Sequence, residues 1–406
     1  MFIIDWLLAD NHYMSLLGIV VILGVAALFS SNFRAIKIKL IGVALLAQFA
    51  LAFFILKTSV GGIVFSNISH GIERVYQFAN DGCSFVFGNL ANPAGPWGFV
   101  FAFKVLPIII FYGALMALLF HLGIVQVIVR AMAFVIRPIF GTSGAETLSV
   151  AANSVLGQTE APLLIKNYLP RMTDSEMTTV MVSGMAHLSG AILAVYGLMG
   201  VPILHLLSAS IMAIPGAILI AKLLTPETET PETMGGSHVE IPRQTKNVLD
   251  AISSGTGDGL SLALNVAAML IAFISIMSLV NAILVGITGW SLNAIFAKLF
   301  YVVAYLIGIA PGECEAAGTL LGQKLVINEF VAYSSMVGMS MSTRAVAILT
   351  YALAGFSNFS CIGIQIGGIG AICPSKRETL TRLGMKALLG GTLANLLNAA
   401  IASLFV

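Results

Sequence analysis

The stretch GQTEAP, residues 157–162, places an amide, a carboxylate and a helix-breaking proline inside one of the most apolar regions of the chain. A carboxylate at the centre of a bilayer costs about 3 kcal/mol or more, so it normally faces a cavity and serves a function there. A second such place follows at Asn328-Glu329-Phe330. Two intramembrane glutamates in interrupted segments indicate a polar binding site near the middle of a transporter.

The composition is that of a polytopic membrane protein. Of the 406 residues, 58% are hydrophobic and 9% are charged, whereas a soluble domain carries about 25% charged residues. The net charge of +2 and the absence of a long basic tract give no indication of nucleic-acid binding. GxSxG, HExxH and P-loop motifs are absent, so the sequence predicts neither an enzyme nor an enzyme cofactor.

Eight apolar runs are long enough to span a bilayer, which takes about 20 helical residues, and they predict an all-α polytopic protein. The runs lie near 13–30, 39–58, 98–119, 175–198, 199–223, 262–287, 344–372 and 380–405. Residues 62–92 and 121–141 are amphipathic and predict interfacial helices. Residues 142–171 and 293–343 are rich in small and polar residues and interrupted at their centres, which predicts two re-entrant hairpins. Residues 225–246, biased toward Pro, Glu and Thr, predict a flexible polar loop.

The lysines and arginines of short loops set the orientation of such a chain. Arg34, Lys37 and Lys39 follow the first span and place that loop in the cytoplasm. The N-terminus is then expected on the outside, and eight spans return the C-terminus to the same side.

An internal repeat relates the two interrupted regions. Glu146 and Glu160 are 14 residues apart, as are Glu315 and Glu329. Each pair precedes an apolar segment with a polar break, GMAHLSG at 184–190 and GFSNFSC at 355–361. Paired broken segments in the two halves of a transporter point to a substrate site at the bilayer midplane.

The residue types at the breaks suit a small polar solute. Glu160 and Glu329 offer hydrogen-bond acceptors, whereas Gln158 and Asn358 can both donate and accept. The ends of the interrupted helices add exposed backbone groups and partial charges. The alternative for each glutamate is a structural role, as a helix cap or an interhelical bridge that holds a hairpin.

Other residues near the breaks also have two interpretations. Glu146 and Glu315, the outer pair of the repeat, are expected to cap or brace the hairpins. Phe356 could stack on a planar ring, although simple packing is the commoner role for a phenylalanine here. His187 is a candidate proton site because imidazole titrates near neutral pH, and a buried neutral histidine is the alternative.

At these residues the chain resembles the concentrative nucleoside transporter family. The matching stretches are FVFAFKVLP at 99–107, AAN at 151–153, GQTEAPL at 157–163, NEFVAY at 328–333 and NFS at 358–360. The resemblance extends over nearly the whole chain, whose length is that of the bacterial form with eight spans. It implies a homotrimer in which each protomer has a scaffold and a transport domain, the latter built on an inverted repeat and moving like an elevator.

The resemblance and the repeat together divide the chain into five parts. Residues 1–120 are expected to hold mainly scaffold helices and the surface helix. Residues 121–224 form the first half of the transport domain, with the hairpin 142–171 and the broken helix 175–198. The polar loop 225–246 follows, and residues 247–290 are expected to form an interfacial helix and a scaffold helix. Residues 291–406 form the second half, with the hairpin 293–343, the broken helix 344–372 and the last helix.

The resemblance also implies the substrate contacts. Those to the nucleobase fall on Gln158, Thr159 and Glu160, and those to the ribose on Glu329, Asn358 and Cys361. A serine usually stands at the last of these positions. Cysteine is a weak hydrogen-bond donor, so this departure weakens the case for that one contact.

The sodium ligands of the family fall on Asn153 and Leu156 near the first hairpin tip, and on His187 and Leu188 in the facing helix. A serine is expected where His187 stands, and an imidazole is a poor substitute for the hard oxygen ligands that Na+ prefers. Coupling to Na+ and coupling to H+ therefore both stay open.

The combined prediction is a cation-coupled symporter that imports nucleosides as a multi-pass protein of the bacterial inner membrane. One alternative is an uncoupled nucleoside or nucleobase facilitator or channel, and another is a receptor that senses substrate with the same pocket. The expected partners are a nucleoside, Na+ or H+, the lipid bilayer and the other protomers of a trimer, with no nucleic acid.

Overall fold

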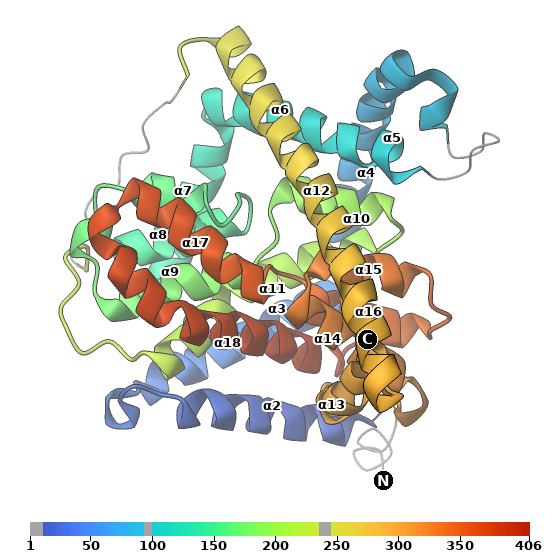
Figure 1. Ribbon diagram of the computed structural model, residues 1–406. Coiled ribbons are helices and arrows are strands. Elements are labelled where there is room, and N and C mark those ends of the chain that lie inside the picture. The colour runs from blue at the N-terminus through green and yellow to red at the C-terminus, as the bar shows by residue number, and fades with distance from the viewer. Residues whose placement is uncertain (1–10, 93–99, 235–244) are drawn as a thin grey trace.

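The computed structural model describes residues 11–92, 100–234 and 245–406, and every regular element in these ranges is a helix (Figure 1). Backbone N–H and C=O groups in a bilayer must be satisfied within the protein, and a helix does this within a single segment. In the described ranges, six helical segments are long and apolar enough to cross a membrane. The chain is therefore a multi-pass membrane protein, as its composition predicted.

The first part of the chain contributes α2 (His12–Leu28), α3 (Ile38–Lys57), α4 (Ser59–Phe87), the short α5 (Phe101–Lys104) and α6 (Leu106–His121). Helix α4 lies where an amphipathic helix was predicted at 62–92. Its Glu73 and Arg74 are exposed, whereas Tyr76 is buried.

A long helix, α12 (Val248–Thr288), packs along α6 and runs diagonally across the molecule (Figure 1). Small residues allow the two backbones to approach closely. A Cβ atom on Gly113 would lie 2.6 Å from the carbonyl oxygen of Gly255. The prediction of two helices in 247–290 is wrong: the structure has one helix of 41 residues, because the polar turns that Asn247 caps continue without interruption into the apolar part.

The remaining helices occur in two series with the same order. The first series is α7 (Ile124–Phe140), α8 (Gly144–Asn153), the 3-10 turns η4 (Ala161–Ile165) and η5 (Leu169–Arg171), α9 (Asp174–Ala186), α10 (Gly190–Leu198) and α11 (Ile203–Leu224). The second is α13 (Leu292–Leu306), α14 (Cys314–Val326), α15 (Glu329–Val337), α16 (Thr343–Leu353), α17 (Phe359–Ile372) and α18 (Arg377–Ala402). The repeat in the sequence is thus also a repeat in the order of helices.

The range 293–343, predicted as one hairpin, contains three α-helices and a short 3-10 turn. Helix α13 ends at Leu306, before Gly308, which has a φ of 91°, and before Pro311. Helices α14 and α15 then follow and join at Ile327 and Asn328. The turn after α13 is short, and for this reason the sequence pattern did not separate α13 from the segment that follows.

The two broken helices meet at their breaks, which lie at 187–189 and 354–358. Gly355 has a φ of 96°, and a Cβ atom there would lie 2.6 Å from the carbonyl carbon and oxygen of Ala186. Helix α18 passes both breaks at Gly391, whose Cβ would lie 2.6 Å from Met185 Cβ and 3.2 Å from Ser357 Cβ. Both polar breaks predicted from the sequence interrupt helices, and glycines allow them to pack together.

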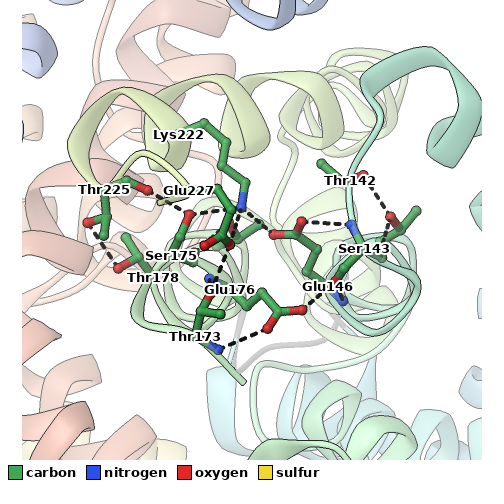
Figure 2. A network of polar contacts seen from close by, with 12 residues as sticks. Thr142, Ser143, Glu146, Thr173, Ser175, Glu176, Thr178, Lys222, Thr225 and Glu227 are labelled. Atoms are coloured by element: carbon green, nitrogen blue, oxygen red, sulfur yellow. Dashed lines mark hydrogen bonds and ion pairs between the residues drawn. The ribbon is translucent and has the colours of Figure 1, made fainter. Parts of the chain in front are cut away.

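A buried ion pair braces the start of the first series (Figure 2). Lys222 Nζ of α11 lies 2.7 Å from Glu146 Oε2, and both side chains are almost inaccessible. Glu146 also forms a capping box with Ser143 at the start of α8. Ser143 Oγ donates to Glu176 Oε1 (2.5 Å), and Glu176 caps α9 in the same way with Thr173. Glu146 therefore has the bracing role that was predicted for it.

Part of the predicted flexible loop covers this cluster of charges. The Thr233 hydroxyl accepts from the Ala145 N–H (3.0 Å), and the Thr233 carbonyl accepts from the Gly144 N–H (3.1 Å). Glu227 Oε2 accepts from Thr173 Oγ1 (2.8 Å). Residues 225–234 are thus held by specific contacts to the ends of two helices. Residues 235–244 of the predicted loop lie outside the described residues.

The outer glutamate of the second repeat does not act as a brace. Glu315 is exposed in the first turn of α14. The nearby Glu313 braces this end instead, because its carboxylate accepts from the Ser342 N–H (2.6 Å) and from Ser342 Oγ (2.8 Å).

Replacing Gly355 tests the contact between the breaks. We expect Gly355→Ala to lower the free energy of unfolding by about 2 kcal/mol, because the backbone at this position is left-handed and pressed against Ala186. The matched control is Gly363→Ala on α17, where a Cβ atom would meet nothing within 4 Å and helix propensity favours alanine. Thermal unfolding in detergent measures both, and equal melting temperatures for the two variants would contradict the packing described here.

Candidate substrate and cation site

The loop that follows α8 forms a tip between two of the broken-helix segments. The Val155 carbonyl accepts from the Gly190 N–H at the start of α10 (3.0 Å). On the other side, a Cβ atom on Gly368 of α17 would lie 2.7 Å from Thr159 Cγ2. The segment GQTEAP therefore lies against both interrupted helices rather than at the edge of the molecule.

A chain of hydrogen bonds joins predicted site residues from distant parts of the sequence. Gln158 Nε2 donates to Cys361 Sγ (3.3 Å), and the Cys361 N–H donates to Asn358 Oδ1 (3.1 Å). Asn358 Nδ2 donates to Glu329 Oε2 (3.2 Å). Tyr196 OH of α10 donates to Glu329 Oε1 (2.9 Å). The tip, the second hairpin and both broken helices thus meet in one continuous polar chain.

Local helix ends explain why these side chains point toward one another. Asn358 is the N-cap of α17, and its amide nitrogen stays available for Glu329. Asn328 caps α15 through the Val331 N–H (2.9 Å), which places Glu329 in the first turn of that helix. A carboxylate is favourable there because the N-terminal end of a helix carries partial positive charge.

Glu160 differs from Glu329 in its surroundings. Glu329 is 5% exposed, and its carboxylate accepts hydrogen bonds from the side chains of Tyr196 and Asn358. Glu160 is exposed, and its Oε2 accepts from the Gly157 N–H (3.0 Å). Both glutamates therefore take part in local structure, but Glu160 keeps acceptor capacity for a solute.

Phe356 is half-buried and packs against the hydrophobic core. Its carbonyl oxygen accepts from the Asn358 N–H (2.9 Å). Of the two roles predicted for Phe356, the structure shows the packing role: its side chain packs against the core beside the break.

Two predicted cation-site residues are brought together by Ser183. Asn153 Nδ2 donates to Ser183 Oγ (3.1 Å), and His187 Nδ1 lies 2.8 Å from the Ser183 carbonyl oxygen. A carbonyl can only accept, so Nδ1 carries the proton in the neutral ring and Nε2 is an acceptor. Asn153 Oδ1 and His187 Nε2 are both buried, and neither has a hydrogen-bond partner among the described residues.

These free acceptors suit a small cation. Most buried polar atoms are paired, so a buried acceptor without a protein partner is a place where a water molecule, a ligand, an ion or a proton can bind. Leu156 and Leu188, the other two predicted residues, are buried near the tip and the break, and they can offer only backbone carbonyls. The described residues contain no cluster of three His, Cys, Asp or Glu side chains, so the site suits Na+ or H+ rather than a transition metal.

The sequence analysis missed several polar residues at this centre, among them Tyr196, Lys324 and Asn395. Tyr196 contacts Glu329, as described above. Lys324 Nζ donates to the carbonyl oxygens of Ala352 (2.8 Å) and Ala354 (3.2 Å) and to Asn395 Oδ1 (2.9 Å). Lys324 could have been identified from the sequence, because a lysine inside an apolar segment is costly and therefore points to a buried polar partner.

Asn395 of α18 connects the two breaks. Its Nδ2 donates to the Ala186 carbonyl at the end of α9 (2.8 Å), while its Oδ1 accepts from Lys324 and from Ser357 Oγ (3.2 Å). Asn395 of the last long helix therefore pairs one backbone carbonyl at the first break directly, and it contacts the second break through the side chains of Lys324 and Ser357.

Comparison with known proteins gives consistent matches over most of the chain. Models of the Na+ dependent nucleoside transporter family match residues 17–90 (N-terminus) and 205–403 (C-terminus), and a nucleoside recognition model matches residues 102–202. The nucleoside permease NupC of Helicobacter pylori is 39% identical, covering 97% of each chain. Sodium/nucleoside cotransporter 1 of Rattus norvegicus is 36% identical over 99% of this chain and 66% of its own length.

A solved structure has the same fold. CNTnw in an inward-facing, substrate-bound state superimposes with a TM-score of 0.93 at 40% identity. The match covers 97% of this chain and 98% of that one.

Removing the Tyr196 hydroxyl tests whether Glu329 is a charged acceptor. A hydrogen bond to a charged group contributes about 2 kcal/mol and one between neutral groups about 1 kcal/mol. We expect Tyr196→Phe to cost about twice as much stability as Tyr333→Phe, whose hydroxyl donates to the neutral Thr350 carbonyl (2.8 Å). Thermal unfolding compares the two, and equal losses would show that Glu329 is not ionised at this bond.

Proposed function

The chain belongs to the concentrative, Na+-dependent nucleoside transporter family, and we propose that it is a cation-coupled symporter that imports nucleosides by an elevator-type alternating-access mechanism. Proteins of this family are transporters and not enzymes. The observation that carries the proposal is the hydrogen-bonded chain from Gln158 through Cys361 and Asn358 to Glu329. It gathers donors and acceptors from both halves of the repeat around the two helix breaks.

In this proposal, Gln158, Thr159 and Glu160 bind the nucleobase. Their amide, hydroxyl and carboxylate groups can pair with both donors and acceptors on a base edge. Phe356 supports the break beside them.

The ribose is assigned to Glu329, Asn358 and Cys361. Sugar hydroxyls would donate to Glu329 in place of the bond from Asn358, whose Nδ2 would then donate to a hydroxyl oxygen. Cys361 contributes least because a thiol is a weak donor.

The cation is assigned to Asn153, Leu156, His187 and Leu188. Three of these would offer oxygen atoms, the ligands that Na+ prefers. His187 Nε2 offers a nitrogen lone pair, which binds H+ well and Na+ poorly. The free acceptors on Asn153 and His187 support a cation site without deciding between the two ions.

The proposed architecture has eight spans and two re-entrant hairpins. Helices α2, α16 and α17 are each shorter than the six long apolar segments. Helix α2 would form a seventh span, and α16 and α17 together would form the eighth. The loop after α8 and the α14–α15 pair would form the hairpins.

We assign residues 1–120 and 247–290 mainly to the scaffold. Residues 121–224 and 291–406 would form the two halves of the moving domain, joined by the loop 225–246. Helix α12 buries only a few small residues on its own protomer, which leaves an apolar surface for lipid and for the other protomers of a homotrimer. We place the protein in the bacterial inner membrane, because a relative that matches over nearly the full chain is a permease of the bacterium Helicobacter pylori.

A matched pair of glutamates tests the substrate assignment. We expect Glu329→Gln to reduce nucleoside uptake at least 100-fold with normal folding, because the ribose hydroxyls lose a charged acceptor. Glu315→Gln is the control, since Glu315 is the outer glutamate of the same repeat pair and is exposed. Radiolabelled uridine uptake into proteoliposomes measures both, and near-normal uptake by Glu329→Gln would refute the assignment.

Ion gradients test the coupling. We expect the wild-type protein to accumulate uridine above equilibrium only when a Na+ or H+ gradient is imposed. His187→Ser should shift the dependence toward Na+, because a hydroxyl oxygen replaces the imidazole. His205→Ser on α11 is the control: it removes a partly buried histidine away from the cation site and should leave the ion dependence unchanged.

The same experiment separates the alternatives. Equilibration without accumulation would identify an uncoupled facilitator or channel, and binding without uptake would identify a receptor. Unchanged pH and Na+ dependence in His187→Ser would show that this histidine is only structural.

A further inference from the structure

A second glutamine, Gln365 of α17, lies behind Gln158. It is fully buried, and its Nε2 donates both to the Met181 carbonyl of α9 (3.0 Å) and to Gln158 Oε1 (3.1 Å). We infer that Gln365 is a positioning residue that fixes which end of the Gln158 amide is presented to the substrate. The identity of the substrate in this inference rests on the proposed function. The hydrogen bonds between Gln365, Met181 and Gln158 are observed independently of it.

The bonds from Gln365 to Met181 and Gln158, and from Gln158 to Cys361, form a relay of hydrogen bonds. The Met181 carbonyl determines which atom donates in each of them. A carbonyl oxygen can only accept a hydrogen bond, so the end of Gln365 that faces it must be the NH2 group. The second hydrogen of that NH2 group then points to Gln158 and requires an acceptor there. Gln158 consequently turns its oxygen toward Gln365 and its own NH2 group toward Cys361.

Gly184 of α9 lies close to both glutamines. A Cβ atom on Gly184 would lie 2.7 Å from Gln365 Nε2 and 3.0 Å from Gln158 Cβ. The Gln365 amide and the Cβ of Gln158 are thus packed against the bare backbone of α9. Gln365 Oε1 has no hydrogen-bond partner among the described residues, so the two bonds made by Nε2 are what hold this orientation.

The relay therefore ends in an N–H donor at the site. Its present partner, Cys361 Sγ, is a weak acceptor, and a solute with a better acceptor can replace the thiol with little loss. The neighbouring Glu160 carboxylate is an acceptor. A donor beside an acceptor fits a base edge on which a keto oxygen stands next to a ring N–H, as in uracil, and disfavours an edge that offers donors only.

The test is a double-mutant cycle on the two glutamines. Gln365→Met keeps the size of the side chain and removes both donated bonds, so the Gln158 amide loses its fixed orientation. We expect the KM for uridine to rise about tenfold, with kcat and the cation dependence almost unchanged. The preference for uridine over 4-thiouridine, whose sulfur is a poor acceptor, should shrink by a similar factor.

The double variant distinguishes positioning from a separate contribution. If Gln365 acts through Gln158, Gln158→Met combined with Gln365→Met should raise KM no more than Gln158→Met alone, because coupled residues are not additive. Gln323→Met is the matched control: Gln323 is a buried amide that donates to Asn293 Oδ1 (3.3 Å) and lies outside the relay. It should leave the KM for uridine unchanged.

A second readout does not depend on transport. The melting temperatures of the two single variants and the double variant in detergent should show the same lack of additivity. Additive effects on KM or on melting temperature would overturn the inference while leaving the proposed function intact. Loss of uridine accumulation by the wild-type protein would instead refute the proposed function, and the melting temperatures would still decide the role of Gln365.

Discussion

The packing of two interrupted helices against each other is the constraint on which the rest of the structure depends. Each break exposes backbone groups that cannot be left unpaired in the interior of a membrane protein. Gly355 allows the two backbones to touch. Asn395 Nδ2 donates to the Ala186 carbonyl at the first break, and Asn395 Oδ1 accepts from Lys324, whose Nζ donates to the carbonyls at the second break. The first hairpin tip lies against these breaks, so residues more than 200 positions apart, such as Gln158 and Cys361, are joined by a hydrogen bond.

The two breaks differ in the polar side chains that contact them. At the second break Lys324 Nζ donates to the carbonyls of Ala352 and Ala354. Near the first break Asn153 and His187 both contact Ser183, and one acceptor on each has no partner among the described residues. In the proposed mechanism this asymmetry matters, since a mobile cation would bind at the break that has no such lysine. Binding there would also link the first hairpin tip to α9, so that the substrate site and the ion site share the same segment.

Much of this could be predicted from the sequence, because the informative residues break a local rule. A glutamate in an apolar run and a polar gap in a span are both costly in a bilayer, and both locate Glu160, Glu329 and the two breaks. Tyr196, Gln365 and Asn395 could not be found in this way, since a single Tyr, Gln or Asn in a helix is ordinary until its partner on another helix is known. The sequence also failed where tertiary contacts override composition. Residues 225–234 have the composition of a flexible loop, yet Thr233 and Glu227 bind helix ends there.

The most direct test of the account is a structure of the protein determined with a bound nucleoside. The account predicts density for the solute between the GQTEAP tip and the α16–α17 break, with the base beside Gln158 and Glu160 and the ribose within hydrogen-bond distance of Glu329 and Asn358. It also predicts that Gln365 still donates to the Met181 carbonyl in that complex. A nucleoside bound elsewhere, with the hydrogen-bonded chain from Gln158 to Glu329 undisturbed, would show that the meeting of the breaks is structural and would contradict the central claim.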